Sequence, residues 1–219
     1  MILKNRLFER KAPDRSAKIF LIFCEGHVRE PQYFRYFNEI SSQIRLEVIQ
    51  AEEQDNNSPT GLYQKAQQFV VKTTENPNPR YELNNNDEIW FVIDTDQWKS
   101  KIWELRQFCN NHTNWYIAQS NPCFEVWLYY HFFEKFPEFE NIEISENWKT
   151  YLNQMIKGGF DSRKHPIYVQ KAISNAKKNY KEKKQTVEIG CTEVYMLAEK
   201  FFPLIKEEIE EGLKRIENL

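Results

Sequence analysis

Short, almost continuous apolar runs alternate with helical stripes along the first two thirds of this chain. Residues 18–24 (KIFLIFC) and 88–93 (EIWFVI) are nearly all apolar, as is typical of parallel strands buried on both faces. Residues 44–51 (IRLEVIQA) alternate apolar and polar positions, and residues 115–119 (WYIAQ) form another short run. The pattern therefore predicts four strands.

Segments with apolar residues at helical spacing separate these strands. They cover residues 30–41, 58–72, 98–110 and 122–133. Pro31 suits a first helical turn, and the Asn- and Pro-rich residues 74–87 indicate an exposed loop. A strand–helix unit repeated four times predicts an α/β fold, with a parallel sheet that is covered by helices on both faces.

Strand signals nearly disappear after Phe136. Helical patterns then recur at residues 147–156, 168–183 and 192–202, and again after Pro203. We therefore predict two parts. Residues 1–136 form the α/β core, with an N-terminal tail at 1–16, and residues 137–219 form a helical extension packed on that core.

Composition narrows the class of protein. The chain has 219 residues, 41% hydrophobic and 28% charged, and a net charge of −2, which is ordinary for a globular protein and gives no overall sign of a nucleic-acid binder. Its four cysteines form no C-x-x-C pair, so neither a zinc ribbon nor a redox motif is indicated. Without a signal peptide or an apolar run of roughly 18 residues, we expect a cytoplasmic protein with reduced cysteines and no membrane association.

Acidic residues follow two of the predicted buried strands. Glu25 comes directly after the first strand, and Asp94 and Asp96 follow the third. Ligands of open parallel sheets bind beyond the carboxyl ends of the strands. Three carboxylates at that edge repel one another unless a hard cation lies among them, and Mg²⁺ takes oxygen ligands. The alternative is that each acid only caps the helix that follows it.

Several motifs resemble the RloB-like family, which is found in bacterial restriction and defence loci. They are FCEGHVREPQYF at 23–34, WFVIDTD at 90–96, SNPCFEVWLYYHF at 120–132, GFDSRKH at 159–165, AISNAKK at 172–178 and CTEVYMLAEKF at 191–201. The arrangement also resembles the Toprim domain of topoisomerases, primases and OLD-type nucleases. We accordingly predict a Toprim-like open parallel sheet of about four strands in the order 2-1-3-4, with a C-terminal helical extension.

The resemblance implies roles for the acidic residues. Glu25 would be the general acid/base, and Asp94 and Asp96 would bind Mg²⁺ or Mn²⁺, with Glu25 also within reach of the metal. Gly26 would let backbone or phosphate approach closely. At position 27, where related proteins often carry an acidic or basic residue, this chain has His27, which is either a phosphate or metal contact or a solvated loop residue.

Three residues near these motifs have competing interpretations. Glu30 either complements the dipole of its own helix, which we favour, or lies in an outer shell of the metal. His131 falls on an apolar helical stripe with Phe124 and Trp127, so we expect a hydrogen-bonded core histidine. Glu125 lies off that stripe. In the order 2-1-3-4 it would face the D-x-D pair, so it is a further candidate metal ligand.

A local basic cluster offsets the acidic balance of the chain. Residues 157–184 contain nine Lys and Arg residues against two acids, a net +7. Such a cluster is either a solvated helix face or a binding surface for phosphates. The candidate phosphate-binding residues are Arg163, Lys164, Lys177 and Lys178. Lys164, which follows a Gly-Gly loop, is the candidate for stabilising charge on the reacting phosphate.

Taken together, these features predict a Mg²⁺-dependent nuclease or phosphodiester-processing protein of a bacterial defence system. The alternative is a Toprim-like module that binds nucleic acid or a nucleotide without catalysis and signals to a partner. A phosphatase that uses D-x-D with a nucleophilic aspartate is disfavoured, because such enzymes carry the pair after their first strand. The expected partner is nucleic acid, and an ATPase or other defence-system protein and a second copy of the chain are further candidates.

Overall fold

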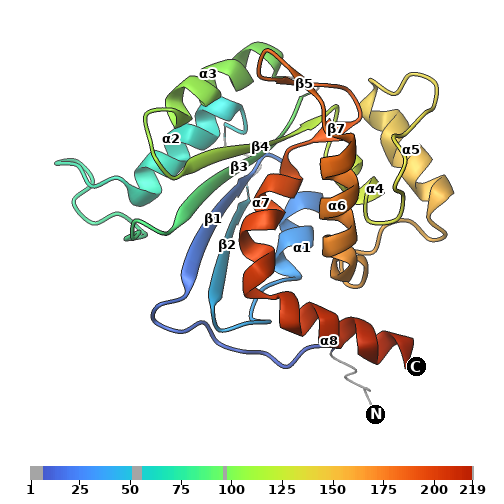
Figure 1. The fold of residues 1–219 in the computed structure, drawn as a ribbon. Coiled ribbons are helices and arrows are strands. Elements are labelled where there is room, and N and C mark those ends of the chain that lie inside the picture. The colour runs from blue at the N-terminus through green and yellow to red at the C-terminus, as the bar shows by residue number, and fades with distance from the viewer. Residues whose placement is uncertain (1–6, 51–55, 96–97, 219) are drawn as a thin grey trace.

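The computed structural model describes residues 7–50, 56–95 and 98–218 (Figure 1). Part of the predicted N-terminal tail, the predicted strand end at Ala51 and the candidate ligand Asp96 lie outside these residues. The elements in chain order are β1 (Lys18–Cys24), α1 (Arg29–Arg35), β2 (Ile44–Gln50), α2 (Pro59–Val70), β3 (Glu88–Asp94), α3 (Lys99–Cys109), β4 (Trp115–Asn121), α4 (Glu125–Tyr129), α5 (Ser145–Met155), η1 (His165–Tyr168), α6 (Val169–Asn179), β5 (Glu182–Lys183), β6 (Thr186–Val187), β7 (Cys191–Thr192), α7 (Val194–Phe201), η2 (Phe202–Leu204) and α8 (Lys206–Glu217).

The main sheet has the order β2-β1-β3-β4-β7. Strands β1 to β4 are parallel, which confirms the predicted order 2-1-3-4 and the α/β class. Strand β7 joins the edge antiparallel to β4, with Asn121 opposite Cys191. A two-residue strand is too short for its hydrophobic pattern to be recognised, so the sequence did not predict the fifth strand.

Helices cover both faces of the sheet, as the continuous apolar strands predicted. Figure 1 shows α2 and α3 on one face and α1, α6 and α7 on the other. Alternate residues of β1 point to opposite faces of the sheet. Leu21 and Phe23 pack beneath α2 and α3, whereas Phe20 and Ile22 belong to a second, larger apolar core on the other face. This two-sided burial explains why KIFLIFC contains so few polar residues.

Two predicted helices are shorter than expected. Helix α1 ends at Arg35, although Phe37 and Ile40 beyond it remain in the core. Helix α4 contains only five residues and begins after the Asn121–Pro122 peptide, which is cis. In both places, apolar spacing correctly predicted the buried residues but not the length of the helix.

The predicted helical extension also contains strands. It contributes the β5–β6 hairpin and β7, in addition to α5, α6, α7 and α8. One apolar core includes residues from both predicted parts, from Phe20 in β1 to Ile209 in α8. The boundary between residues 136 and 137 stays a prediction. None of the described helices has both the length and the apolar character that a membrane span requires.

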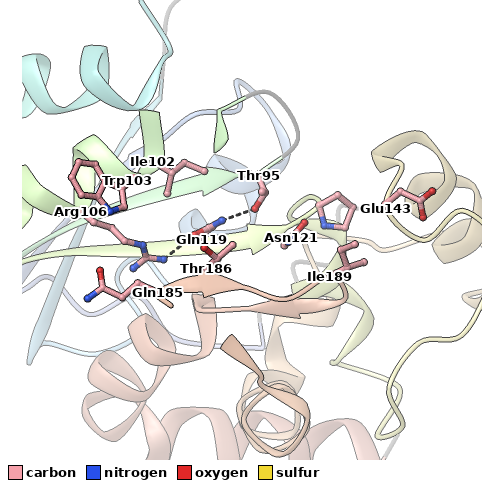
Figure 2. Close-up of a pocket in the computed structure, with 11 residues that line it drawn as sticks. Thr95, Ile102, Trp103, Arg106, Gln119, Asn121, Glu143, Gln185, Thr186 and Ile189 are labelled. Atoms are coloured by element: carbon pink, nitrogen blue, oxygen red, sulfur yellow. Dashed lines mark hydrogen bonds between the residues drawn. The ribbon is translucent and has the colours of Figure 1, made fainter. Parts of the chain in front are cut away.

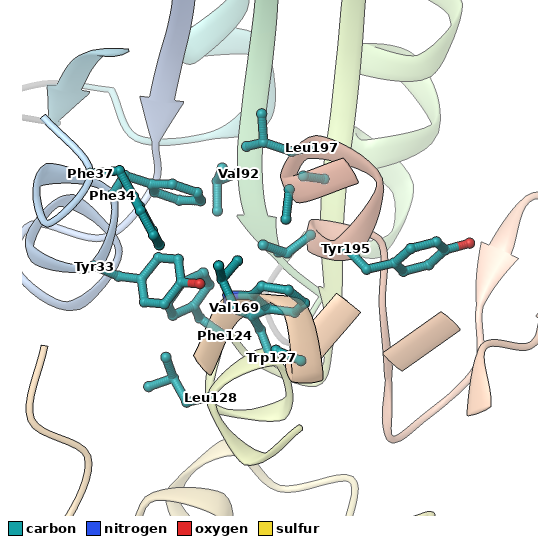
Figure 3. Packing of buried hydrophobic residues seen from close by; sticks show 14 of the residues in the cluster. Tyr33, Phe34, Phe37, Val92, Phe124, Trp127, Leu128, Val169, Tyr195 and Leu197 are labelled. Carbon is teal, nitrogen blue, oxygen red and sulfur yellow. The ribbon is translucent and has the colours of Figure 1, made fainter. Parts of the chain in front are cut away.

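Aromatic rings between α1 and α4 form the centre of the larger core (Figure 3). The Tyr33 ring contacts Phe124 and Trp127 edge to face, with centroid distances of 5.6 and 6.1 Å. His131 is 1% exposed. Its Nε2 lies 3.0 Å from Tyr33 Oη, and its Nδ1 lies 3.1 Å from the Trp127 carbonyl oxygen. These contacts confirm that the stripe is core and that His131 is hydrogen-bonded within it.

The burial of His131 predicts a pH-dependent stability. Burial lowers the pKa of His131 from 6.5 to about 3, because the charged imidazolium loses its hydration. The unfolded chain therefore takes up this proton first as pH falls below about 6.5, and stability decreases from there towards pH 3. Each pH unit in that window should cost about 1.4 kcal/mol from this residue. Urea unfolding of His131→Gln between pH 7 and 5 should show a flatter dependence than the wild type.

Tyr33→Phe is the matched control, because it removes the hydroxyl partner and keeps the imidazole. It should lower the free energy of unfolding at every pH while the pH dependence remains. An identical pH dependence in His131→Gln and the wild type would contradict the assignment.

Candidate functional site

The first two acidic positions meet at the carboxyl edge of the sheet. Strands β1 and β3 are parallel neighbours, with Cys24 opposite Val92. The Glu25 N–H continues this ladder by donating to the Val92 carbonyl oxygen at 3.0 Å. Glu25 therefore follows β1 at the same edge at which β3 ends in Asp94. The structure brings these two predicted residues together.

Both carboxylate oxygens of Glu25 accept hydrogen bonds. Oε2 accepts the Asp94 backbone N–H at 3.0 Å, and Oε1 accepts the Trp98 indole N–H at 2.5 Å. Donors on both oxygens fix the rotation of the carboxylate, which is held against the turn after β3. The sequence did not single out Trp98, although an indole two residues beyond D-x-D is a donor that requires an acceptor when it is partly buried.

Glu30 lies in the first turn of α1, as the helix-dipole interpretation requires, and its side chain is buried. It is 6% exposed. Burial raises its pKa above the usual range, and the charge of Glu125 raises it further, although the Glu30 backbone N–H and Arg29 act in the opposite direction. A Cβ at Gly26 would overlap the Glu30 carboxylate. In this structure, then, the space that Gly26 leaves open is used by a glutamate side chain.

Glu125 is also buried, at 4% exposure, at the start of α4. Arg29 Nε lies 4.0 Å from Glu125 Oε1. Burial, followed by the charges of Glu125 and Asp94, raises the pKa of the Cys123 thiol. The expectation that Glu125 would face the D-x-D pair stays a prediction, since Asp96 lies outside the described residues.

The metal ligands predicted from the sequence are only partly described. Asp96 is outside the described residues, and among those that are described no three His, Cys, Asp or Glu side chains form a group that could hold a metal ion. What the described part of the edge offers is carboxylate oxygen from Glu25, Asp94 and Glu125. Mg²⁺ prefers oxygen and is commonly held by one or two carboxylates together with water and substrate phosphate. The type of donor at this edge therefore suits Mg²⁺, although the three described carboxylates do not form one ligand group.

The remaining predicted phosphate contacts lie in different places. His27 is exposed after β1, and its Nε2 lies 3.0 Å from Asn57 Nδ2. Arg163 forms a two-pronged ion pair with Asp161, whose pKa it lowers to about 2. Lys164 lines a pocket beside Arg35, at the end of α1 away from Glu125. The catalytic role of Lys164 stays a prediction.

Lys177 and Lys178 lie in the last turn of α6. Arg163 precedes η1, so η1 and most of α6 separate it from the two lysines along the chain. Lys177 Nζ lies 2.7 Å from Glu199 Oε1, and Lys178 Nζ lies 2.5 Å from Glu134 Oε1. The four predicted basic residues thus form two separate pairs. Charge counting along the sequence detects an excess of lysine but not how a helix distributes it in space.

The fold and the site together define an α/β protein whose parallel sheet carries a part-buried, hydrogen-bonded carboxylate, Glu25, at its carboxyl edge. The family model for RloB-like proteins matches residues 20–201, so this chain belongs to the RloB-like family, as the motifs suggested. Neither the curated proteins nor the solved structures gave a match.

The contact between Gly26 and Glu30 can be tested through stability alone. Gly26→Ala introduces a Cβ into the Glu30 carboxylate, and overpacking of this kind typically costs about 1–3 kcal/mol. Glu30→Ala removes the obstructing carboxylate, so the double variant should lose less stability than the two single variants together. A double-mutant cycle on the free energy of unfolding measures this coupling. Strict additivity would show that the two residues do not contact each other in solution.

Proposed function

We propose that this RloB-like chain is a metal-dependent nuclease or phosphodiester-processing protein of a bacterial defence system. The observation that carries the proposal is the Glu25 carboxylate, held by the Asp94 N–H and the Trp98 indole over the end of β3. A fixed carboxylate beside an aspartate at the carboxyl edge of a parallel sheet supports hydrolytic chemistry at that edge. The defence context rests on the resemblance to the family.

Each residue of the edge has a proposed role. Asp94 and Asp96 would bind Mg²⁺ or Mn²⁺, with Glu25 and Glu125 as further oxygen donors. The bound ion would polarise the phosphate and lower the pKa of water. Glu25 would accept a proton from the attacking water. Trp98 is a positioning residue, because it acts only through Glu25.

The substrate proposed for this edge is nucleic acid. Gly26 and His27 lie beside Glu25 and would contact the phosphate nearest the reaction. Arg163 and Lys164 would contact phosphates further along the strand, and Lys177 with Lys178 would form a second contact region. A second copy of the chain and an ATPase or other defence-system protein remain predicted partners.

Metal binding should stabilise the folded chain by linkage. Millimolar Mg²⁺ or Mn²⁺ should raise the melting temperature of the wild type, and the variant with both Asp94→Ala and Asp96→Ala should show no rise. The matched control carries Glu210→Ala and Glu211→Ala, two solvent-accessible acids of α8, and removes the same charge far from the edge. Differential scanning fluorimetry measures the shift. An equal rise in all three proteins would place cation binding elsewhere.

Glu25→Gln should abolish cleavage of single-stranded oligonucleotides in Mg²⁺ or Mn²⁺ while nucleic-acid binding is retained, because the amide keeps the shape of the side chain but cannot accept the proton. Trp98→Phe should lower turnover less, since it removes the indole donor and leaves the carboxylate. Gel-resolved cleavage rates measure both effects.

Cleavage by Glu25→Gln at the wild-type rate would reject Glu25 as the acid/base. If the wild-type protein binds oligonucleotides and cleaves none with either metal, the non-catalytic binding module becomes the better description.

A further inference from the structure

A pocket of about 400 Å³ adjoins the acidic edge on the α3 face of the sheet. Its wall includes Thr95, which lies between Asp94 and Asp96 in the chain. Figure 2 shows Trp103 and Arg106 of α3 at one end with Gln185 close to Arg106, Ile189 at the opposite end, and Gln119 near the middle. Its volume falls within the range typical of small-ligand sites.

The apolar part of this pocket is exposed to solvent. Trp103 is 59% exposed and Ile189 is 41% exposed, and both line the pocket from different segments of the chain. Large apolar side chains left in water on both sides of one opening are typical of ligand-binding surfaces. An accessible indole is also the side chain on which planar heteroaromatic rings stack most readily.

The polar part supplies a hydrogen-bond donor that lacks an acceptor. Arg106 Nη2 donates to Gln119 Oε1 and to the Glu193 carboxylate at 2.8 Å. The Arg106 Nε–H is buried and has no hydrogen-bond partner among the described residues. A buried donor without an acceptor destabilises the protein. Because this nitrogen exposes almost no surface, a ligand acceptor could reach it only after the Arg106 side chain shifts within the pocket.

The hairpin that closes the pocket is strained. Lys183 pairs with Thr186, which leaves a two-residue turn of Lys184 and Gln185. Their φ angles are 51° and 61°, in the left-handed region that Asn-Gly normally occupies in such turns. Unfavourable backbone of this kind persists where function requires it. Gln185 lines the pocket, whereas Lys184 is not among the lining residues.

We propose that this pocket binds an unpaired nucleobase of the nucleic-acid strand whose phosphate lies at the acidic edge. The base would stack on Trp103, and its ring nitrogen or carbonyl oxygen would accept from the Gln185 amide, with Arg106 Nε as a second donor once the arginine side chain shifts. Bases can enter such a pocket only from single-stranded or unstacked regions. This inference rests on the proposed function and narrows its substrate to strands with an unpaired base.

The test uses fluorescein-labelled 12-nucleotide single strands of DNA and RNA. Each strand is either intact or carries one abasic site, and a series of strands moves that site along the sequence. Binding is measured by anisotropy in EDTA, and cleavage is measured separately in Mg²⁺. The readout is the ratio of Kd for the abasic strand to Kd for the intact strand. In the wild type we expect one position with a ratio of about five to one hundred, as expected for loss of one stacked base.

Trp103→Ala should bring that ratio close to one, and Phe108→Ala should leave it unchanged, because Phe108 is an exposed ring of the same helix outside the pocket. Gln185→Gly should lower the ratio and raise the melting temperature by relieving strain. The control Lys184→Gly should also raise the melting temperature. It should weaken binding of intact and abasic strands equally, since only a charge is lost.

The outcomes separate this inference from the proposed function. Cleavage with an abasic ratio of one at every position overturns the pocket and leaves the nuclease standing. Base-dependent binding that requires Trp103, without cleavage, supports the pocket and rejects the nuclease. Absence of binding to every strand rejects both. A mononucleotide that competes as strongly as the 12-mer would show that the pocket takes free nucleotides and would overturn the assignment to a strand.

Discussion

Buried and part-buried carboxylates near one edge of a parallel sheet are the constraint on which the rest of this structure depends. Parallel strands all end on the same side, so Glu25 and Asp94 are adjacent because of topology. Glu30 and Glu125 lie beneath them and are almost completely buried. Like charges in a poorly hydrated region oppose folding, and the raised pKa of Glu30 reports that opposition.

The chain compensates with specific donors and with close packing. Glu25 accepts two N–H groups, and Arg29 approaches Glu125. Gly26 leaves room for the Glu30 carboxylate. A cation at the edge would reduce the remaining repulsion, which is the physical reason for linking metal binding to stability. Glu25, Gly26, Arg29 and Glu125 thus share one problem of charge and burial, whichever reaction the edge performs.

The sequence predicted the parts of the fold that depend on local pattern. Strands β1 and β3 were predicted because burial on both faces makes their sequences almost continuously apolar. His131 was assigned to the core by its position on the apolar stripe. A strand of two residues, such as β7, is too short to show a hydrophobic period, so it could not be predicted from the sequence pattern. The Trp98 contact with Glu25 joins residues 73 positions apart. Only the packing of α3 onto the sheet creates it.

The same limit explains why the sequence could not place the basic residues in space and why the pocket was not foreseen. Its wall combines α3, the end of β4 and the β5–β6 hairpin, three segments whose proximity is tertiary. Thr95 connects this wall to the acidic edge: its N–H donates to Ser120 and Pro122 carbonyl oxygens, and its hydroxyl accepts from the Gln119 amide at 2.7 Å. These bonds fix the backbone that follows Asp94. In the proposed complex, a base held in the pocket would therefore set the position of its own phosphate relative to Asp94, and positioning of this kind is a large part of what enzymes contribute to a reaction.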